Sequence, residues 1–117
     1  MDQRYNTRYD ICLPKGLVNN YCQNLINMFY KILPMKENGE ETLGVYMEGL
    51  MFELVGAKSV MVALRHDALY LSLLSILQGM IDQPECEVAV VKREVFSAIS
   101  ICNKLKDRYG YRVIKDE

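Results

Sequence analysis

Hydrophobic residues recur along most of this chain at the three- and four-residue spacing of amphipathic α-helices. Prolines, glycines and short polar stretches separate four such segments. We predict helices over about 15–33, 42–65, 67–82 and 88–109. Residues 1–13 are expected to form an extended N-terminal arm, and residues 111–117 a polar tail. The pattern indicates an all-α fold, a single-domain antiparallel four-helix bundle over residues 1–117.

The first segment has one apolar side and one polar side. Two adjoining rows at helical spacing form the apolar side, and they consist of Leu17, Tyr21, Leu25 and Phe29, and of Val18, Cys22, Ile26 and Leu33. Pro14 suits the first turn of this helix, where its missing N–H costs nothing. Pro34 is expected to end the helix, and the acidic stretch 36–41 to form a loop.

The second segment carries a row of small residues. Thr42 is the expected N-cap, and Gly49, Gly56 and Ala63 then recur every seven residues along one side. Each glycine inside a helix costs about 1 kcal/mol relative to alanine. We therefore interpret this side as one that another backbone approaches closely. A kink or break near Gly56 is the alternative.

The third segment is the most unusual part of the chain. Between residues 68 and 81 only four residues are not hydrophobic, and these are Ser72, Ser75, Gln78 and Gly79. A helix that is apolar all round is buried on every side. At about 21 Å this one is too short to span a membrane. Asp67 or His66 is its expected cap, and the short connection predicts that the second and third helices are antiparallel neighbours.

The apolar third helix needs a cover, and the sequence leaves two possibilities open. Either the rest of the same chain surrounds it, or a second subunit does. We favour a symmetric homodimer, because two-fold dimers are the commonest oligomers. The predicted interface combines the third helix with the row of small residues, and its candidate residues are Gly49, Gly56, Ala63, Leu73, Leu77 and Met80.

The secondary structure at the start of the fourth segment is ambiguous, whereas the end of its helix is clear. By composition residues 86–91 suit a strand or the start of a helix. A heptad seam then favours the helix, through Val88, Val91, Val95, Ala98, Cys102, Leu105 and Tyr109. Gly110 is a good residue to follow its C-terminus.

Charge is uneven along the chain although the net charge is only −1. Residues 34–87 are acidic and residues 88–115 are basic, with a candidate electrostatic patch at Lys92, Arg93, Lys104, Arg108 and Arg112. A few phosphate contacts would give only weak, salt-sensitive binding. The third helix also lacks the polar side chains that a DNA-reading helix presents to the major groove. An accessory protein that touches nucleic acid through its basic last helix is thus a lesser alternative.

The four cysteines, at positions 12, 22, 86 and 102, form no Cys-x-x-Cys pair. The first ten residues are polar and lack the apolar core of a signal peptide. We therefore predict a cytoplasmic protein with reduced thiols. Cys22 and Cys102 lie on apolar faces and are expected to behave as small buried hydrophobic residues.

No pattern for catalysis, a metal or a cofactor stands out. His66 is the one histidine, the cysteines lack metal-ligand spacing, and no glycine-rich phosphate loop is present. We expect a small cytoplasmic interaction or regulatory module that self-associates and has no catalytic activity. The main alternative is a bundle whose third helix lines a cavity for a hydrophobic small molecule, with Tyr46, Tyr70 or His66 as the polar anchor.

Overall fold

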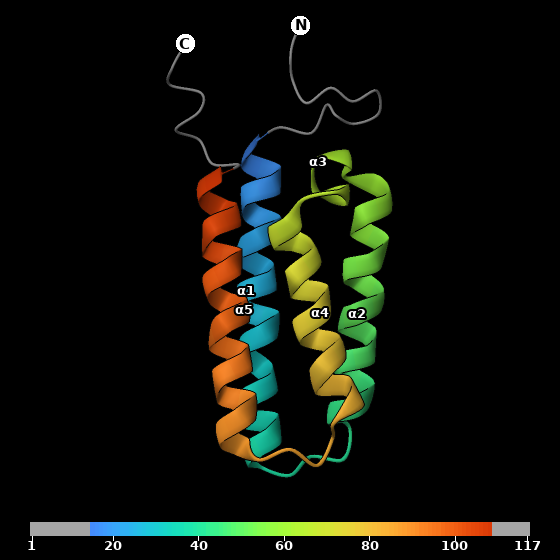
Figure 1. Ribbon diagram of the computed structural model, residues 1–117, viewed down its shortest axis with the longest axis vertical. Helices are drawn as coiled ribbons and strands as arrows, with labels where there is room; N and C mark the ends of the chain where they lie inside the picture. The colour runs from blue at the N-terminus through green and yellow to red at the C-terminus, as the bar shows by residue number, and fades with distance from the viewer. Residues whose placement is uncertain (1–14, 109–117) are drawn as a thin grey trace, which may run out of the picture.

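The computed structural model describes residues 15–108, and every regular element in that range is a helix. The elements are α1 (Lys15–Glu37), α2 (Leu43–Val60), α3 (Val62–Arg65), α4 (Ala68–Asp82) and α5 (Val88–Arg108). Figure 1 shows four long helices side by side, with the single turn of α3 at the end where α1 begins and α5 ends. The predicted all-α antiparallel four-helix bundle is thereby confirmed. The predicted N-terminal arm and C-terminal tail lie outside the described residues.

Successive long helices run in opposite directions and form a square. α1 packs against α5 and α2, and α4 packs against the same two helices, so α1 and α4 lie across the diagonal. α1 and α5 form the most extensive pair. We call the end with α3 the terminal end of the bundle, and the end with the connections 38–42 and 83–87 its loop end.

One row of side chains from each long helix fills the core. The predicted seam of α5 is confirmed for five of its members, which are buried, namely Val91, Val95, Ala98, Cys102 and Leu105. Val88, the first predicted member, is exposed instead, and Tyr109 lies outside the described residues. Cys22, Leu25 and Phe29 of α1 face this row and are fully buried. The small side chains of Ala98 and Cys102 allow α5 to lie close against α1.

The first helix continues past Pro34, so the prediction that this proline ends it was wrong. Pro34 lies inside α1, which runs one turn further, to Glu37. A proline in a helix removes one donor, and its own carbonyl still accepts the bond from the Asn38 N–H at 2.9 Å. The chain turns away at Gly39, whose φ of 66° is the left-handed conformation that glycine favours after a helix.

The second predicted helix is divided in two, and the division lies at Met61 rather than near Gly56. Met61 has an extended ψ of 95°, and it separates α2 from α3. The Arg65 guanidinium folds back and donates to the carbonyls of Lys58 at 3.1 Å and Ser59 at 2.9 Å. A cation at these last carbonyls is favourable, because they carry the negative end of the helix dipole.

Asp67 fixes the start of α4 and connects it to the end of α5. Its carboxylate accepts from the backbone N–H groups of Leu69 at 2.9 Å and Tyr70 at 3.4 Å, which is an N-cap. Its other oxygen binds the Arg108 guanidinium, and only 2% of the Asp67 side chain is exposed. Of the two predicted caps, Asp67 is therefore the correct one, while His66 is exposed.

We predict that Asp67→Ala lowers the free energy of unfolding by about 2–3 kcal/mol. The loss combines a helix cap, worth about 1 kcal/mol, with a hydrogen bond to a charged group. Asp67→Asn keeps an oxygen for the cap and should lose about half as much. Urea denaturation of both variants measures these values. An Asp67→Ala variant as stable as the natural protein would contradict the role given to this carboxylate.

Candidate functional site

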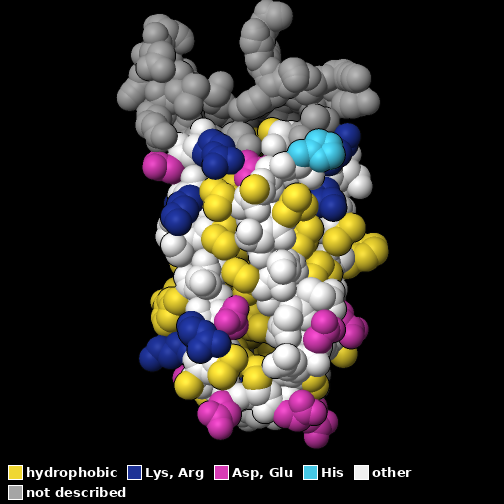
Figure 2. Space-filling view, in the orientation of Figure 1, with side chains coloured by type: hydrophobic (Ala, Val, Ile, Leu, Met, Phe, Trp, Pro, Cys, Tyr) yellow, Lys and Arg dark blue, Asp and Glu magenta, His cyan; other side chains and the backbone are white. Residues whose placement is uncertain are grey.

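α2 is apolar on two opposite sides. Its inner side supplies four buried residues to the core, which are Met47, Leu50, Leu54 and Ala57. On the opposite side Phe52 is 81% exposed, Val45 is 72% exposed, and Val60 is also exposed. Figure 2 shows hydrophobic side chains reaching the surface along this helix. We call the set Val45, Gly49, Phe52, Gly56 and Val60 the outer face of α2.

No contact within the described chain requires glycine at the two glycine positions of the outer face. A Cβ added at Gly49 or Gly56 would meet no atom within 4 Å, so no described backbone lies against them. Ala63 does not continue their row, because it lies in α3, beyond the break at Met61. The predicted close approach of another backbone is therefore not made within residues 15–108.

α4 does have an outward polar side, contrary to our expectation. Its five residues that are not hydrophobic are all exposed, namely Ser72, Ser75, Gln78, Gly79 and Asp82. Its flanks are half-buried toward the neighbouring helices, and among its large apolar side chains Leu71 is the one that is exposed. The cover of this helix comes from its own chain.

The predicted interface residues of α4 lie inside the bundle. Leu73 and Leu77 are completely buried, and Met80 nearly so. These three side chains cannot touch a partner while the bundle is closed. The surplus apolar surface of the molecule thus belongs to α2 rather than to α4.

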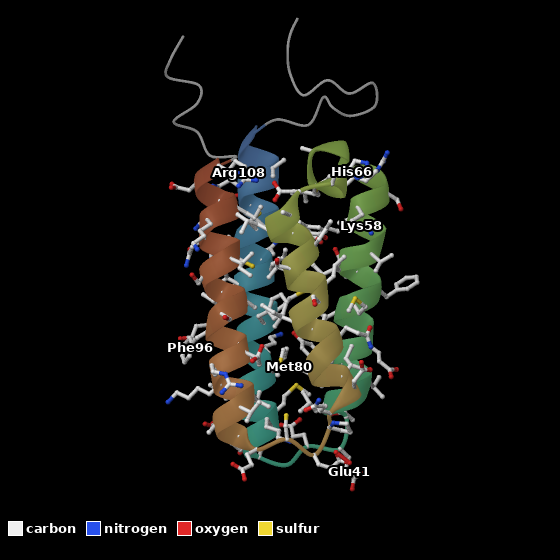
Figure 3. All side chains as sticks on the ribbon, viewed as in Figure 1. Glu41, Lys58, His66, Met80, Phe96 and Arg108 are labelled. Atoms are coloured by element: carbon white, nitrogen blue, oxygen red, sulfur yellow. The ribbon has the colours of Figure 1, made fainter. Side chains whose placement is uncertain are left out.

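The hydroxyl groups of two of the three proposed anchors for a small molecule already make hydrogen bonds within the protein. The Tyr70 hydroxyl donates to the Leu54 carbonyl at 2.7 Å, and the Tyr46 hydroxyl donates to the Met28 carbonyl at 2.9 Å. His66 is exposed at the terminal end (Figure 3). These bonds hold α4 to α2 and α2 to α1, so we assign both tyrosines a structural role.

A buried cluster of weak acids lies in the half of the bundle nearer the terminal end. Cys22 of α1 and Cys102 of α5 are fully buried. Burial raises the pKa of the Cys22 thiol to about 11 and that of Cys102 to about 12. Burial likewise raises the pKa of Tyr70 to about 12, and that of Tyr21 further still. Groups that keep their protons so firmly are poor nucleophiles and bases at neutral pH.

The Tyr21 hydroxyl belongs to the same cluster. It is buried and makes no hydrogen bond with the described residues that meets strict geometry. Tyr70 and Glu53 lie close enough to raise its pKa further.

The candidate basic patch is divided between two places. Lys92 and Arg93 lie in the first turns of α5, and Lys104 and Arg108 in its last turns, about 18 Å apart along the helix. Arg93 pairs with Glu94 at 3.4 Å, and Arg108 pairs with Asp67. Arg112 lies outside the described residues. The described cations therefore form no continuous surface for nucleic acid.

A cavity of about 370 Å³ opens at the loop end of the bundle. Its floor consists of apolar side chains from all four long helices, including Ile32, Met47, Met80 and Val91, and charged residues stand at its rim. Cys86 lines the cavity and is partly exposed, unlike the two core cysteines. The sequence had pointed to α4 as the lining of a cavity but not to the loop end, because the distant helix ends meet there only after folding.

Comparison with known proteins found no matching family model, no similar curated protein and no similar solved structure. Residues 15–108 contain no cluster of three or more histidine, cysteine or acidic side chains that could hold a metal ion. Within the same range no helix is long and apolar enough to cross a membrane. The outer face of α2 and the loop-end cavity are thus the two candidate sites.

We predict that iodoacetamide at pH 8 labels Cys86 in the folded protein and spares Cys22 and Cys102. The two core thiols are fully buried and hold their protons, and alkylation needs an accessible thiolate. Peptide mass spectrometry of a Cys12→Ser variant measures the three sites, with urea-unfolded protein as the control for full labelling. Equal labelling of Cys22 and Cys86 in the folded state would contradict the buried cluster.

We also predict that stability falls as the pH rises from about 9 to about 11. In this window the unfolded chain releases the thiol protons of Cys22 and Cys102, whereas the folded chain retains them. The folded state then binds more protons, so the free energy of unfolding falls by about 1.4 kcal/mol per pH unit for each such thiol. Cys102→Ala should show a shallower fall in urea melts across this range, and an unchanged slope would refute the assignment.

Proposed function

We propose that this protein is a non-catalytic interaction module that self-associates through the outer face of α2. The observation that carries the proposal is the apolar outward side of this helix, which holds the three most exposed large hydrophobic residues of the described chain, Phe52, Val45 and Val60. An outward helix face is normally polar, and a contiguous exposed apolar surface usually marks an interaction site. Phe52, at 81% exposure, is the most exposed large hydrophobic residue of the described chain.

The spacing of the outer face favours another helix as its occupant. Val45, Gly49, Phe52 and Gly56 follow one another at intervals of four, three and four residues. This is the spacing of a coiled-coil seam, in which side chains of one helix enter hollows of the next. Large and small residues alternate along it. Phe52 lies between the two glycines, and Val45 and Val60 each lie next to one.

The same alternation favours a second copy of this chain. In an antiparallel pair related by a two-fold axis near residues 50 and 51, Phe52 lies opposite Gly49 of the second copy. In that register Val45 lies opposite Gly56, and the two remaining contacts follow by symmetry. Each glycine thereby receives a large side chain, which gives a reason for two residues that each cost the helix about 1 kcal/mol.

The size of this surface sets the expected strength of association. Stable interfaces bury about 800 Å² on each partner, and one helix face with three large side chains offers less. We therefore expect a dimer that dissociates on dilution. An association of this kind suits a regulatory or adaptor role, in which the outer face exchanges between copies or partners.

We predict that Phe52→Ser abolishes dimerisation and leaves the fold intact. The side chain is exposed, so its removal costs the monomer little, and it is the largest contact of the seam. Light scattering behind a sizing column, at several concentrations, should give about 27 kDa for the natural chain and 13.5 kDa for the variant. Phe96→Ser is the matched control, because Phe96 is 43% exposed on α5 and contacts Tyr30 edge to face.

Gly49→Leu separates dimerisation from stability. The new side chain has free space and a better helix propensity, so the monomer should become more stable by up to about 1 kcal/mol. It also fills the hollow that Phe52 of the second copy would enter, so the dimer should be lost. A monomeric natural chain at millimolar concentration, or dimers of both Phe52→Ser and Gly49→Leu, would refute the proposal.

A further inference from the structure

The loop-end cavity has the size and construction of a small-molecule site. Its volume of about 370 Å³ falls within the range of ligand pockets, about 300–1,000 Å³. Bundles commonly place ligand sites between facing helices. Here every long helix contributes, with Ile32 from α1, Met47 from α2, Met80 from α4 and Val91 from α5. Figure 3 shows Met80 within the bundle above this end, where Glu41 lies.

Methionines make the floor of the cavity adaptable. Met35, Met47 and Met80 all line it. Methionine has an unbranched, flexible and polarisable side chain, and it is frequent in binding surfaces that accept varied apolar ligands. The cavity therefore suits a flexible hydrocarbon chain better than a rigid ligand with many polar groups.

The rim determines the charge of the ligand. Residues 36–42 and 82–87, which comprise the two connections and the adjoining helix ends, hold six acidic residues and one lysine. Glu40 and Glu41 line the cavity itself, and Figure 2 shows acidic side chains gathered at this end of the molecule. Lys36 is engaged across the mouth, because its Nζ donates to the Pro84 carbonyl at 2.9 Å. The mouth thus carries two carboxylates and one ammonium group among its lining residues, and its net negative charge attracts a cation and repels an anion.

We propose that the loop-end cavity binds a cationic amphiphile, namely an aliphatic chain that ends in a protonated amine. The chain lies among the methionines, and the ammonium group lies at the rim near Glu40 and Glu41. This site is separate from the outer face of α2, and the proposal does not depend on self-association.

The test compares two probes with the same chain and opposite head groups, n-octylammonium and n-octanoate. Isothermal titration at low salt should show n-octylammonium binding at least tenfold more tightly than n-octanoate. Added salt should narrow this difference, because it screens the exposed rim. Equal affinity for the two probes, tighter binding of n-octanoate, or no binding of n-octylammonium at millimolar concentration would overturn the proposal.

Rim variants test the role of the acids. Glu40→Gln combined with Glu41→Gln should weaken n-octylammonium binding at least threefold and leave the fold unchanged, because both residues are exposed. Glu48→Gln combined with Glu53→Gln is the matched control, since it removes two exposed acids of α2 that do not line the cavity. An equal effect of both changes would mean that only net charge matters, and would overturn the assignment to this rim.

A blocking variant locates the probe. Gly44 lines the cavity in the first turn of α2, and a Cβ there would meet no atom within 4 Å. In the natural chain, bound n-octylammonium should protect Cys86, which lines the cavity, from iodoacetamide. Gly44→Leu should preserve the helix while filling the mouth, so that both binding and protection are lost. Gly79→Leu, at an exposed position of α4 that does not line the cavity and where a Cβ meets no atom within 4 Å, should bind as the natural chain does. Normal binding by a folded Gly44→Leu variant would place the probe elsewhere and refute the site.

Discussion

An antiparallel bundle buries only one side of each helix, and this constraint governs the whole structure. α1 and α5 satisfy it, because their core rows meet along nearly their full length. α4 also satisfies it, although most of its residues are apolar, because its few polar residues all lie on the outward side. α2 does not satisfy it. Its second apolar side, with Phe52 at the centre, remains in solvent, and the proposed self-association follows from this mismatch.

The two ends of the bundle are built differently. Contacts at the terminal end stabilise the fold, whereas the loop end holds the proposed binding site. At the terminal end Asp67 caps α4 and binds Arg108, while Arg65 binds the last carbonyls of α2. These charged contacts close that end with specific geometry. At the loop end Lys36 bridges to Pro84, and apolar side chains leave a cavity under an acidic rim. A ligand there would meet adaptable side chains rather than a network of hydrogen bonds.

The sequence predicted most of the fold, because periodicity and caps are local signals. The core row of α5 from Val91 to Leu105, the cap at Asp67 and the presence of four long helices were predicted correctly. Two boundaries were wrong for reasons beyond local pattern. Pro34 is tolerated within α1, and the break at Met61 is stabilised by Arg65, which reaches back from the next turn.

The candidate sites were harder to predict, since they depend on which side of a helix faces inward. The sequence showed that α4 was rich in apolar residues, but not that its polar positions formed one outward stripe. The sequence showed the row of glycines in α2, but not that Val45 and Phe52 beside them are exposed. The cavity joins residues from distant segments, so no local signal indicated it.

The most direct test of the account is whether the outer face of α2 meets its own copy in solution. Isotope-filtered NOE spectroscopy on a mixture of labelled and unlabelled chains detects only contacts between copies. Self-association through the outer face of α2 predicts intermolecular NOEs from the Phe52 ring to the α-protons of Gly49, and from the Val45 methyl groups to the α-protons of Gly56. Intermolecular NOEs confined to other helices, or none at concentrations where the chain is dimeric, would contradict it.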